Sequence, residues 1–484
     1  MAITADEVLD KIRQGEVLRG VELKDLLLEK ATLPGARLVE CDLSGSRFMG
    51  AELRGSDLSG SSFEAADLRY TDLRETDLRG AKLPRARLSH AQLDGARLEG
   101  AHLGGAEVDR VTFASAQLAG STWIEAVLND VDLSKVGSIE GTDFSDADLD
   151  SVLFPGLLVK DVSFRDGRLR LVSFQKATLS GADFTGCRFS RVTFDRSEAP
   201  GLNLREVKSV NCTFREASLD KADFLGAVFE GCDLSLARLT NADLRKSCSN
   251  RYTVAKGAIF DGSDLSNAVF DGVDFSGASF KGVKLRETSL RGANLSDCDL
   301  EGADFTGAII DGANLSRVKL KGASIPLGML LGKELVLEGL DLSELNMAGG
   351  SFKGVSWKGL TLAGAQLPGS DFENADLSRA DLTNADLTGS KFPGANLSGA
   401  RLAGARLAEA DLRGANLKGA DLNGSILTGA SALWKDIRLA SFGPETLVGL
   451  TLHGEIAGLP QKNLPGSFEV RRNLAAVLHK LKDE

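Results

Sequence analysis

Large apolar residues recur at every fifth position along almost the whole chain. The first run extends from Leu18 to Leu133, and three further runs cover residues 139–244, 260–330 and 337–452, each displaced by one or two residues from the run before it. The exceptions to the pattern are the smaller residues Ala199, Ser209 and Ala432. A small residue, usually alanine, stands two positions before most of the large ones, and the residue between them is often Asp or Asn. A fixed period of this kind predicts a repeat architecture.

Neither regular secondary structure can bury a period of five. On an α-helix each fifth residue advances by about 500°, so the large residues would wind around the helix surface. On a straight strand, an odd spacing places successive residues on opposite faces. The pattern is buried only if each group of five contains a short extended segment, with small and large residues inward, followed by a two-residue corner. The sequence therefore predicts an all-β solenoid with flat sides.

The spacing of the phenylalanines predicts the number of sides. Phenylalanine recurs at every tenth residue from Phe144 to Phe194, and again at intervals of twenty from Phe352 to Phe392. With four sides in a coil, residues twenty apart lie directly above one another, so these rings would form stacked ladders. A three-sided coil would scatter them. The aromatic residues therefore favour a four-sided solenoid.

The repeats carry the motif Ala-(Asp/Asn)-Leu-X-X, as in residues 375–379, Ala-Asp-Leu-Ser-Arg. On this motif the chain resembles the pentapeptide-repeat proteins over about residues 18–452. The resemblance implies a right-handed quadrilateral β-helix, and about 85 apolar positions at four per coil correspond to about 21 coils. We expect a capping helix in residues 1–15, the β-helix in residues 16–452, and a linker with an amphipathic helix in residues 453–484.

Both ends carry signals for short helices that would cover the exposed edges of the solenoid. Thr4 and Glu7 have the spacing of a capping box, and Gly15 can end the helix that they begin. Near the other end, Ser467 is placed to begin a helix with one apolar face. That face either caps its own chain, leaving a monomer, or pairs with a second copy in a homodimer. Its residues are Val470, Leu474, Val477, Leu478 and Leu481.

Composition and charge narrow the classes of function. The chain has 57 Lys and Arg against 68 Asp and Glu, a net charge of −11, which argues against direct nucleic-acid binding. The acidic N-terminal segment lacks the pattern of a secretory signal, and no apolar run is long enough to span a membrane. We therefore expect a bacterial cytoplasmic protein that binds protein partners.

The residues that could support chemistry fit the repeat instead. Five of the six cysteines occupy the small inward position, where cysteine substitutes for alanine. The four histidines have no metal-ligand spacing, and most carboxylates take the outward position before Leu or Phe. The sequence thus predicts no catalytic residues, no metal site and no cofactor.

The breaks in the period are candidate functional sites. They lie near residues 134–138, 246–258 and 330–337, and the second contains a polar, basic stretch. We expect this stretch to project as an interaction loop, because loops on rigid scaffolds often carry function. The alternative is a tolerated bulge. The candidate loop residues are Cys248, Asn250, Arg251 and Tyr252.

Three functions remain open. The first is a rigid, non-catalytic protein-binding scaffold; residues 6–9 and 15–20 resemble the start of pentapeptide-repeat regions in accessory proteins of bacterial type VI secretion clusters, which implies a part in effector loading or delivery. The second is a DNA-mimicking binder of DNA gyrase or topoisomerase, of the quinolone-resistance type. Such a mimic needs a sustained negative field, whereas arginines are interleaved along this chain. The third, an enzyme site hidden in an irregular loop, is the least favoured.

Overall fold

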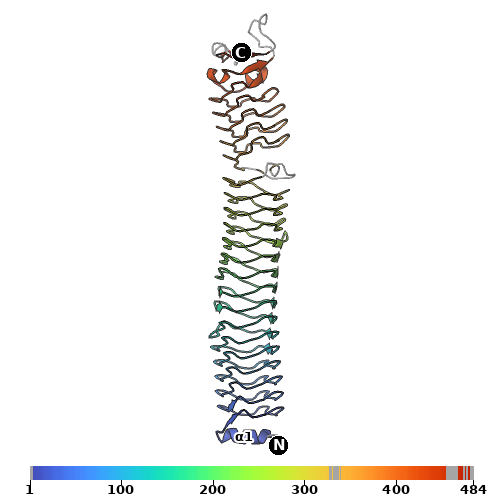
Figure 1. The fold of residues 1–484 in the computed structure, drawn as a ribbon, viewed down its shortest axis with the longest axis vertical. Coiled ribbons are helices and arrows are strands. Elements are labelled where there is room, and N and C mark those ends of the chain that lie inside the picture. The colour runs from blue at the N-terminus through green and yellow to red at the C-terminus, as the bar shows by residue number, and fades with distance from the viewer. Residues whose placement is uncertain are drawn as a thin grey trace. The chain divides into compact units, whose positions relative to one another are not determined.

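A computed structural model describes residues 4–325, 330, 337, 340–453, 467–471, 475, 478 and 479 of the chain. The chain forms two compact units, Met1–Val273 and Asp274–Glu484. In each unit it winds into a four-sided parallel β-solenoid of stacked coils (Figure 1), and the two units together contain about 21 coils. The predicted fold class is therefore confirmed. The boundary between the units coincides with none of the three breaks in the period.

Each group of five residues has the predicted arrangement of inward, outward and corner positions. In residues 91–95, Ala91 and Leu93 are buried, and Gln92 points outward and pairs with both neighbouring coils, at Asp72 and Thr112. The backbone N–H of Gln92 donates to Thr71 in the coil before, at 3.0 Å, and that of Leu93 donates to Thr112 in the coil after, at 2.9 Å. Each extended segment thus joins three coils.

The corner that follows explains the abundance of glycine. The second corner residue has a positive φ, as Gly95 does at 69°, and its N–H donates to Ala114 in the next coil at 2.8 Å. Glycine adopts this conformation without steric cost.

Where consecutive residues pair, the segments count as strands. In the N-terminal unit, β1 pairs with β2 and β6 with β8, and one side of the solenoid is an eight-stranded parallel sheet in the order β12-β11-β10-β9-β7-β5-β4-β3. The strands are β1 (Val17–Arg19), β2 (Arg37–Val39), β3 (Glu107–Asp109), β4 (Val127–Asn129), β5 (Asp148–Asp150), β6 (Leu158–Lys160), β7 (Arg168–Arg170), β8 (Thr178–Ser180), β9 (Arg188–Ser190), β10 (Lys208–Val210), β11 (Val228–Glu230) and β12 (Cys248–Ser249).

The phenylalanine ladders stack as predicted. Phe164 lies between Phe144 and Phe184, with ring centroids 5.4 and 4.7 Å apart and nearly parallel planes. The second ladder faces the first edge-on, since Phe174 lies 5.6 Å from Phe164 at 80°. These rings are fully buried, so they fill the interior of the N-terminal unit.

Single-residue insertions account for the first two breaks in the period. Coils normally pair residues twenty apart, but Gln117 pairs with Ser138 and Asp233 with Val254, each 21 apart. The extra residues are Gly137 and Asn250, and regular stacking resumes after each. At the third break Lys319 pairs with Asp341, which is 22 residues away.

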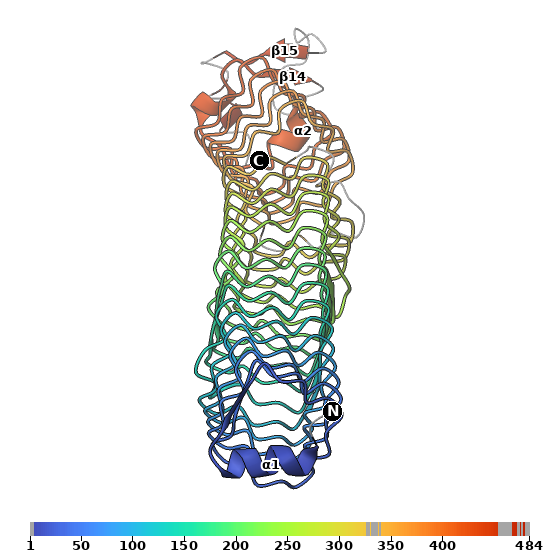
Figure 2. The same cartoon turned by 60° about the horizontal axis from the view of Figure 1, so that its bottom comes forward.

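The N-terminal helix is present as predicted. Helix α1 (Ala5–Arg13) begins at Thr4, whose side chain accepts from the N–H of Glu7 while the Glu7 carboxylate accepts from the N–H of Thr4. Val8 is its fully buried residue. Figure 2 shows α1 lying across the first coil, where it covers the edge of that coil.

The C-terminal end departs from the prediction. The predicted helix start at Ser467 is wrong, because Ser467–Glu469 forms strand β15, antiparallel to β14 (Thr451–His453), which in turn pairs with β13 (Ser431–Leu433). Pairing with the edge of the last coil is favoured over a helix start at Ser467, because it satisfies several backbone N–H and C=O groups at once. Two short helices, α2 (Trp434–Ile437) and the 3-10 helix η2 (Pro444–Leu447), precede β14.

Part of the predicted apolar face can be placed. Val470 and Leu478 are fully buried within their own chain, and the backbone of Val470 bonds to Gly449 and Leu450 in the last coil. Ala475, Leu478 and His479 are helical. The other members of the face, Leu474, Val477 and Leu481, lie outside the described residues.

Candidate interaction surface

Many hydroxyls and thiols at the inward positions donate to backbone carbonyls, although Ser197 Oγ and Trp357 Nε1 are buried without a hydrogen-bond partner among the described residues. Ser61 and Ser390 each donate from the hydroxyl to the carbonyl 23 residues earlier, at 2.7 Å in both cases. The thiol of Cys187 makes the same bond to Phe164 at 2.8 Å. Burial raises the pKa of the Cys298 thiol to about 12, which disfavours the nucleophilic thiolate. These side chains therefore act as fillers of the core, as the sequence predicted for the cysteines.

The candidate loop is smaller than expected. Cys248 lies in β12, and the stretch departs from the regular coil only by the extra residue Asn250 and the corner Arg251–Tyr252. The Asn250 side-chain oxygen accepts from the N–H groups of Tyr252 and Gly231, both at 3.1 Å. The expectation of a projecting loop is therefore wrong, because one asparagine satisfies the donors that the insertion frees.

The structure brings three of the four candidate residues together. The Arg251 guanidinium donates to the Tyr252 hydroxyl at 3.0 Å and lies 5.1 Å from the ring centroid. Tyr252 is 66% exposed, so this pair lies at the surface beside Asn250. Cys248 is half-buried, and burial raises the pKa of its thiol, which does not favour a reactive cysteine.

Five outward aspartates of the described coils are paired with arginines two residues further along. Arg69 donates from Nε and Nη2 to the two oxygens of Asp67, at 2.8 and 2.6 Å. This side-chain bond holds the pKa of Asp67 below its ordinary value. The same clamp recurs at Asp72–Arg74, Asp77–Arg79, Asp243–Arg245 and Asp411–Arg413. The outer surface thus carries interleaved charges of both signs.

These aspartates predict how stability depends on pH. Hydrogen bonds from Thr306 and Arg286 lower the pKa of Asp304 to about 2, and the clamped aspartates shift in the same direction. A depressed folded-state pKa contributes stability above the unfolded value of about 3.9 and loses it as the pH falls toward the folded value. We expect the melting temperature to fall between about pH 5 and pH 2, and to fall less in Asp304→Asn. A melting temperature that stays level or rises over this range in circular dichroism would contradict the assignment.

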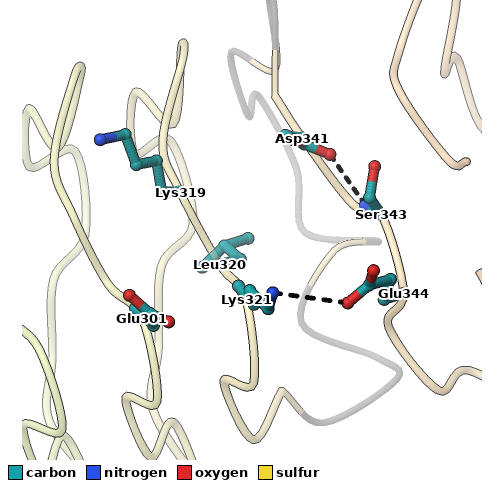
Figure 3. Close-up of a pocket in the computed structure, with 7 residues that line it drawn as sticks. All are labelled: Glu301, Lys319, Leu320, Lys321, Asp341, Ser343 and Glu344. Carbon is teal, nitrogen blue, oxygen red and sulfur yellow. Dashed lines mark hydrogen bonds and ion pairs between the residues drawn. The ribbon is translucent and has the colours of Figure 1, made fainter.

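The surface contains shallow hollows. One of about 350 Å³ lies in the C-terminal unit (Figure 3), where Lys321 pairs with Glu344 at 3.8 Å and Asp341 accepts from the N–H of Ser343 at 2.9 Å. A second, of about 400 Å³, crosses β4, β5, β7 and β9. A third, of about 300 Å³, includes the ion pair Arg196–Glu216. Across the described ranges, no group of three or more His, Cys, Asp or Glu is placed to hold a metal ion. Nor does any described helix have the length and apolar character needed to cross a membrane.

Sequence reasoning missed one feature of the eight-stranded sheet. Arg168, Arg188 and Lys208 occupy the same outward position in β7, β9 and β10 and are paired in register. The signal was available, because three cations recur at the coil period of twenty residues. The net charge of the whole chain does not reveal it, because these three residues are a small part of its 57 Lys and Arg.

The sequence profile of the family described as pentapeptide repeats matches most of the chain. The matched residues are 22–100, 112–150, 161–208, 210–245, 253–322 and 358–429. The chain belongs to the pentapeptide-repeat family. Its Ala-(Asp/Asn)-Leu-X-X groups are therefore the repeats that the resemblance suggested.

Solved pentapeptide-repeat structures show similarity to this member of the family. HetL, described as involved in heterocyst differentiation regulation in the cyanobacterium Nostoc, is 24% identical over 67% of this chain and 100% of its own, with a TM-score of 0.19. QnrB1, described as a plasmid-mediated fluoroquinolone resistance protein, is 19% identical over 53% of this chain and 91% of its own, with a TM-score of 0.16. Rfr23 from the cyanobacterium Cyanothece is 20% identical over 29% of this chain and 91% of its own, with a TM-score of 0.16. Among curated proteins, none matches the chain.

Proposed function

We propose that this pentapeptide-repeat protein is a non-catalytic scaffold that binds protein partners, and that it serves as an accessory or effector-delivery factor of a bacterial type VI secretion system. The observation that carries the scaffold role is the filled interior. The inward positions of the described coils are filled mostly by buried apolar side chains, and hydroxyls and thiols such as those of Ser61 and Cys187 bond to backbone carbonyls. The outer faces are therefore the surface available for recognition.

The secretion role is supported by the N-terminal segment. Residues 6–9 lie in α1 and residues 15–20 lead into the first coil, and this arrangement resembles the start of repeat regions in type VI accessory proteins. Deletion of the gene tests the proposal. We expect an effector to disappear from the secreted fraction while the secretion tube protein is still released. Unchanged secretion of every effector would contradict this role.

The charge clamps weigh against DNA mimicry. A duplex mimic presents a continuous negative field, whereas arginines such as Arg69, Arg74 and Arg79 cover successive outward aspartates. The purified chain should therefore leave gyrase supercoiling unchanged at stoichiometric excess. Inhibition or protection of gyrase in that assay would favour the mimic over the scaffold.

A further inference from the structure

We infer that Arg168, Arg188 and Lys208, with Arg170 and Arg191 beside them, form a docking surface for an acidic segment of a protein partner. We call these five residues the basic ladder. The inference rests on the proposed role as a protein-binding scaffold and gives the class of partner. It does not depend on the secretion role.

The basic ladder is built on a rigid part of the fold. Arg168 pairs in register with Arg188, and Arg188 with Lys208, so the three side chains leave the same face of adjacent strands, which lie about 4.8 Å apart. Arg170 ends β7, and Arg191 follows β9 at the corner. All five residues are exposed. The backbone pairing thus fixes the positions from which the three stacked side chains project.

The charges of the basic ladder are largely unused within the chain. Arg170 pairs with Asp150. Among the described residues, the other four have no ion-pair partner, although neighbouring arginines do: Arg165 reaches Asp183 at 3.2 Å and Arg205 reaches Asp223 at 2.9 Å. Four free cations on three adjacent coils leave a local positive field in a chain of net charge −11.

This arrangement costs stability. Like charges directly opposite each other on a sheet repel. Among all other directly paired residues of the described coils, no two are both Lys or Arg. Acidic residues that pair in register, such as Asp57 with Asp77, have a neighbouring arginine, here Arg79, whereas the three stacked cations have no ion-pair partner among the described residues. Local rules are broken chiefly at functional sites, where the cost is tolerated for another purpose. The stacked cations therefore point to an anionic ligand.

The surroundings favour an acidic protein segment. The basic ladder borders the groove of about 400 Å³ across β4, β5, β7 and β9. Arg168, Arg170 and Arg188 line the side of the groove next to the ladder, and Asp148 and Asp150 of β5 line its other part. Val127 lies in the groove and Val210 ends β10, and each is 38% exposed, so apolar side chains can be accommodated next to carboxylates. Opposite charges and apolar contacts together are typical of protein interfaces.

A nucleic acid fits this surface less well. The three stacked cations span about 10 Å at the strand spacing, and Asp148 and Glu230 lie on the strands beyond them. A duplex would meet this acidic boundary within a few phosphates. The lining residues of the groove also include no exposed aromatic ring on which a base could stack.

Fluorescence anisotropy with the full chain tests the inference. The probe is a labelled short peptide of alternating glutamate and leucine at low ionic strength, and an alternating lysine and leucine peptide is its control. We expect the triple variant R168E/R188E/K208E to bind the acidic peptide at least about tenfold more weakly. The matched control R37E/K82E/K176E changes the net charge equally at separate exposed positions, and it should stay within about threefold of the unchanged chain.

Three results would overturn the inference: no binding of the acidic peptide by the unchanged chain at low salt, equal losses in both triple variants, or tighter binding of a duplex DNA of equal charge. The single variant Arg188→Glu guards against misfolding. It places a carboxylate between Arg168 and Lys208, so it should raise the melting temperature while it weakens peptide binding. A structural role alone would move both quantities down. The peptide assay needs no secretion partner, so its failure is distinguishable from failure of the secretion role.

Discussion

We expect Phe164→Ala to lower the free energy of unfolding by about 3–5 kcal/mol, the range for truncating a fully buried phenylalanine. Phe164 has no exposed surface and stacks on Phe144 and Phe184, while Phe174 meets it edge-on. The cavity cannot collapse easily, because the backbone of Phe164 is fixed by a 2.8 Å bond to Asp183 in the next coil. Urea denaturation of the full chain measures the loss.

Phe164→Leu is the matched control. Leucine fills the equivalent inward position at Leu169 and throughout the solenoid, so we expect a loss of at most about 1.5 kcal/mol. Each coil contacts chiefly its neighbours. Phe164→Ala should therefore accelerate amide hydrogen exchange more in the coils around residue 164 than in the C-terminal unit. A loss below about 1 kcal/mol in Phe164→Ala would show that the ladders contribute little to the packing.

We expect Ala385→Asp to have the largest effect on the C-terminal unit. Ala385 is a fully buried small inward residue. Full burial raises the pKa of a carboxyl by up to about 3–5 units, so at pH 7 the buried group is largely protonated while the unfolded one is ionised. The penalty is therefore set by the roughly three pH units between about 3.9 and 7, at about 1.36 kcal/mol each, and amounts to about 4 kcal/mol. Thermal unfolding followed by circular dichroism measures the cost.

The sign of the pH dependence identifies the cause. A raised folded-state pKa destabilises the fold at every pH above the unfolded value of about 3.9, and the penalty shrinks to zero as the pH falls to that value. The difference between Ala385→Asp and the unchanged chain should therefore shrink on acidification. In the control Ala385→Ser, the hydroxyl can donate to Leu362 as Ser390 donates to Leu367, and the change should stay within about 1 kcal/mol. An equal penalty at every pH would indicate steric overpacking instead of a buried charge.

The fold could be predicted from the sequence because a single rule repeats in every coil. The inward position tolerates few residue types, so the period of five and the phenylalanine ladders fix both the coil and its four sides. The capping box of α1 was also predictable, since Thr4 and Glu7 act on each other within one turn.

The features that escaped prediction depend on contacts between coils. Ser467 has the side chain of a helix N-cap, yet it lies in β15, which pairs with the edge of β14. Asn250 completes the backbone hydrogen bonding of its corner by accepting from Gly231 in the preceding coil, a partner that local sequence does not reveal. The basic ladder arises from residues twenty apart that become neighbours only once the coil length is known.

The central claim is that the outer faces of this protein bind a protein partner. Its most direct test is to cross-link the full chain to captured partners with a carbodiimide and to identify the joined residues by mass spectrometry. The reagent joins a lysine amine to a nearby carboxylate. We expect cross-links between Lys208 and acidic residues of one partner. The variant R168E/R188E retains Lys208, and we expect it to lose both the partner and these cross-links. The claim would be contradicted if R168E/R188E captured the same partner at an unchanged level and neither the unchanged chain nor the variant gave cross-links to Lys208.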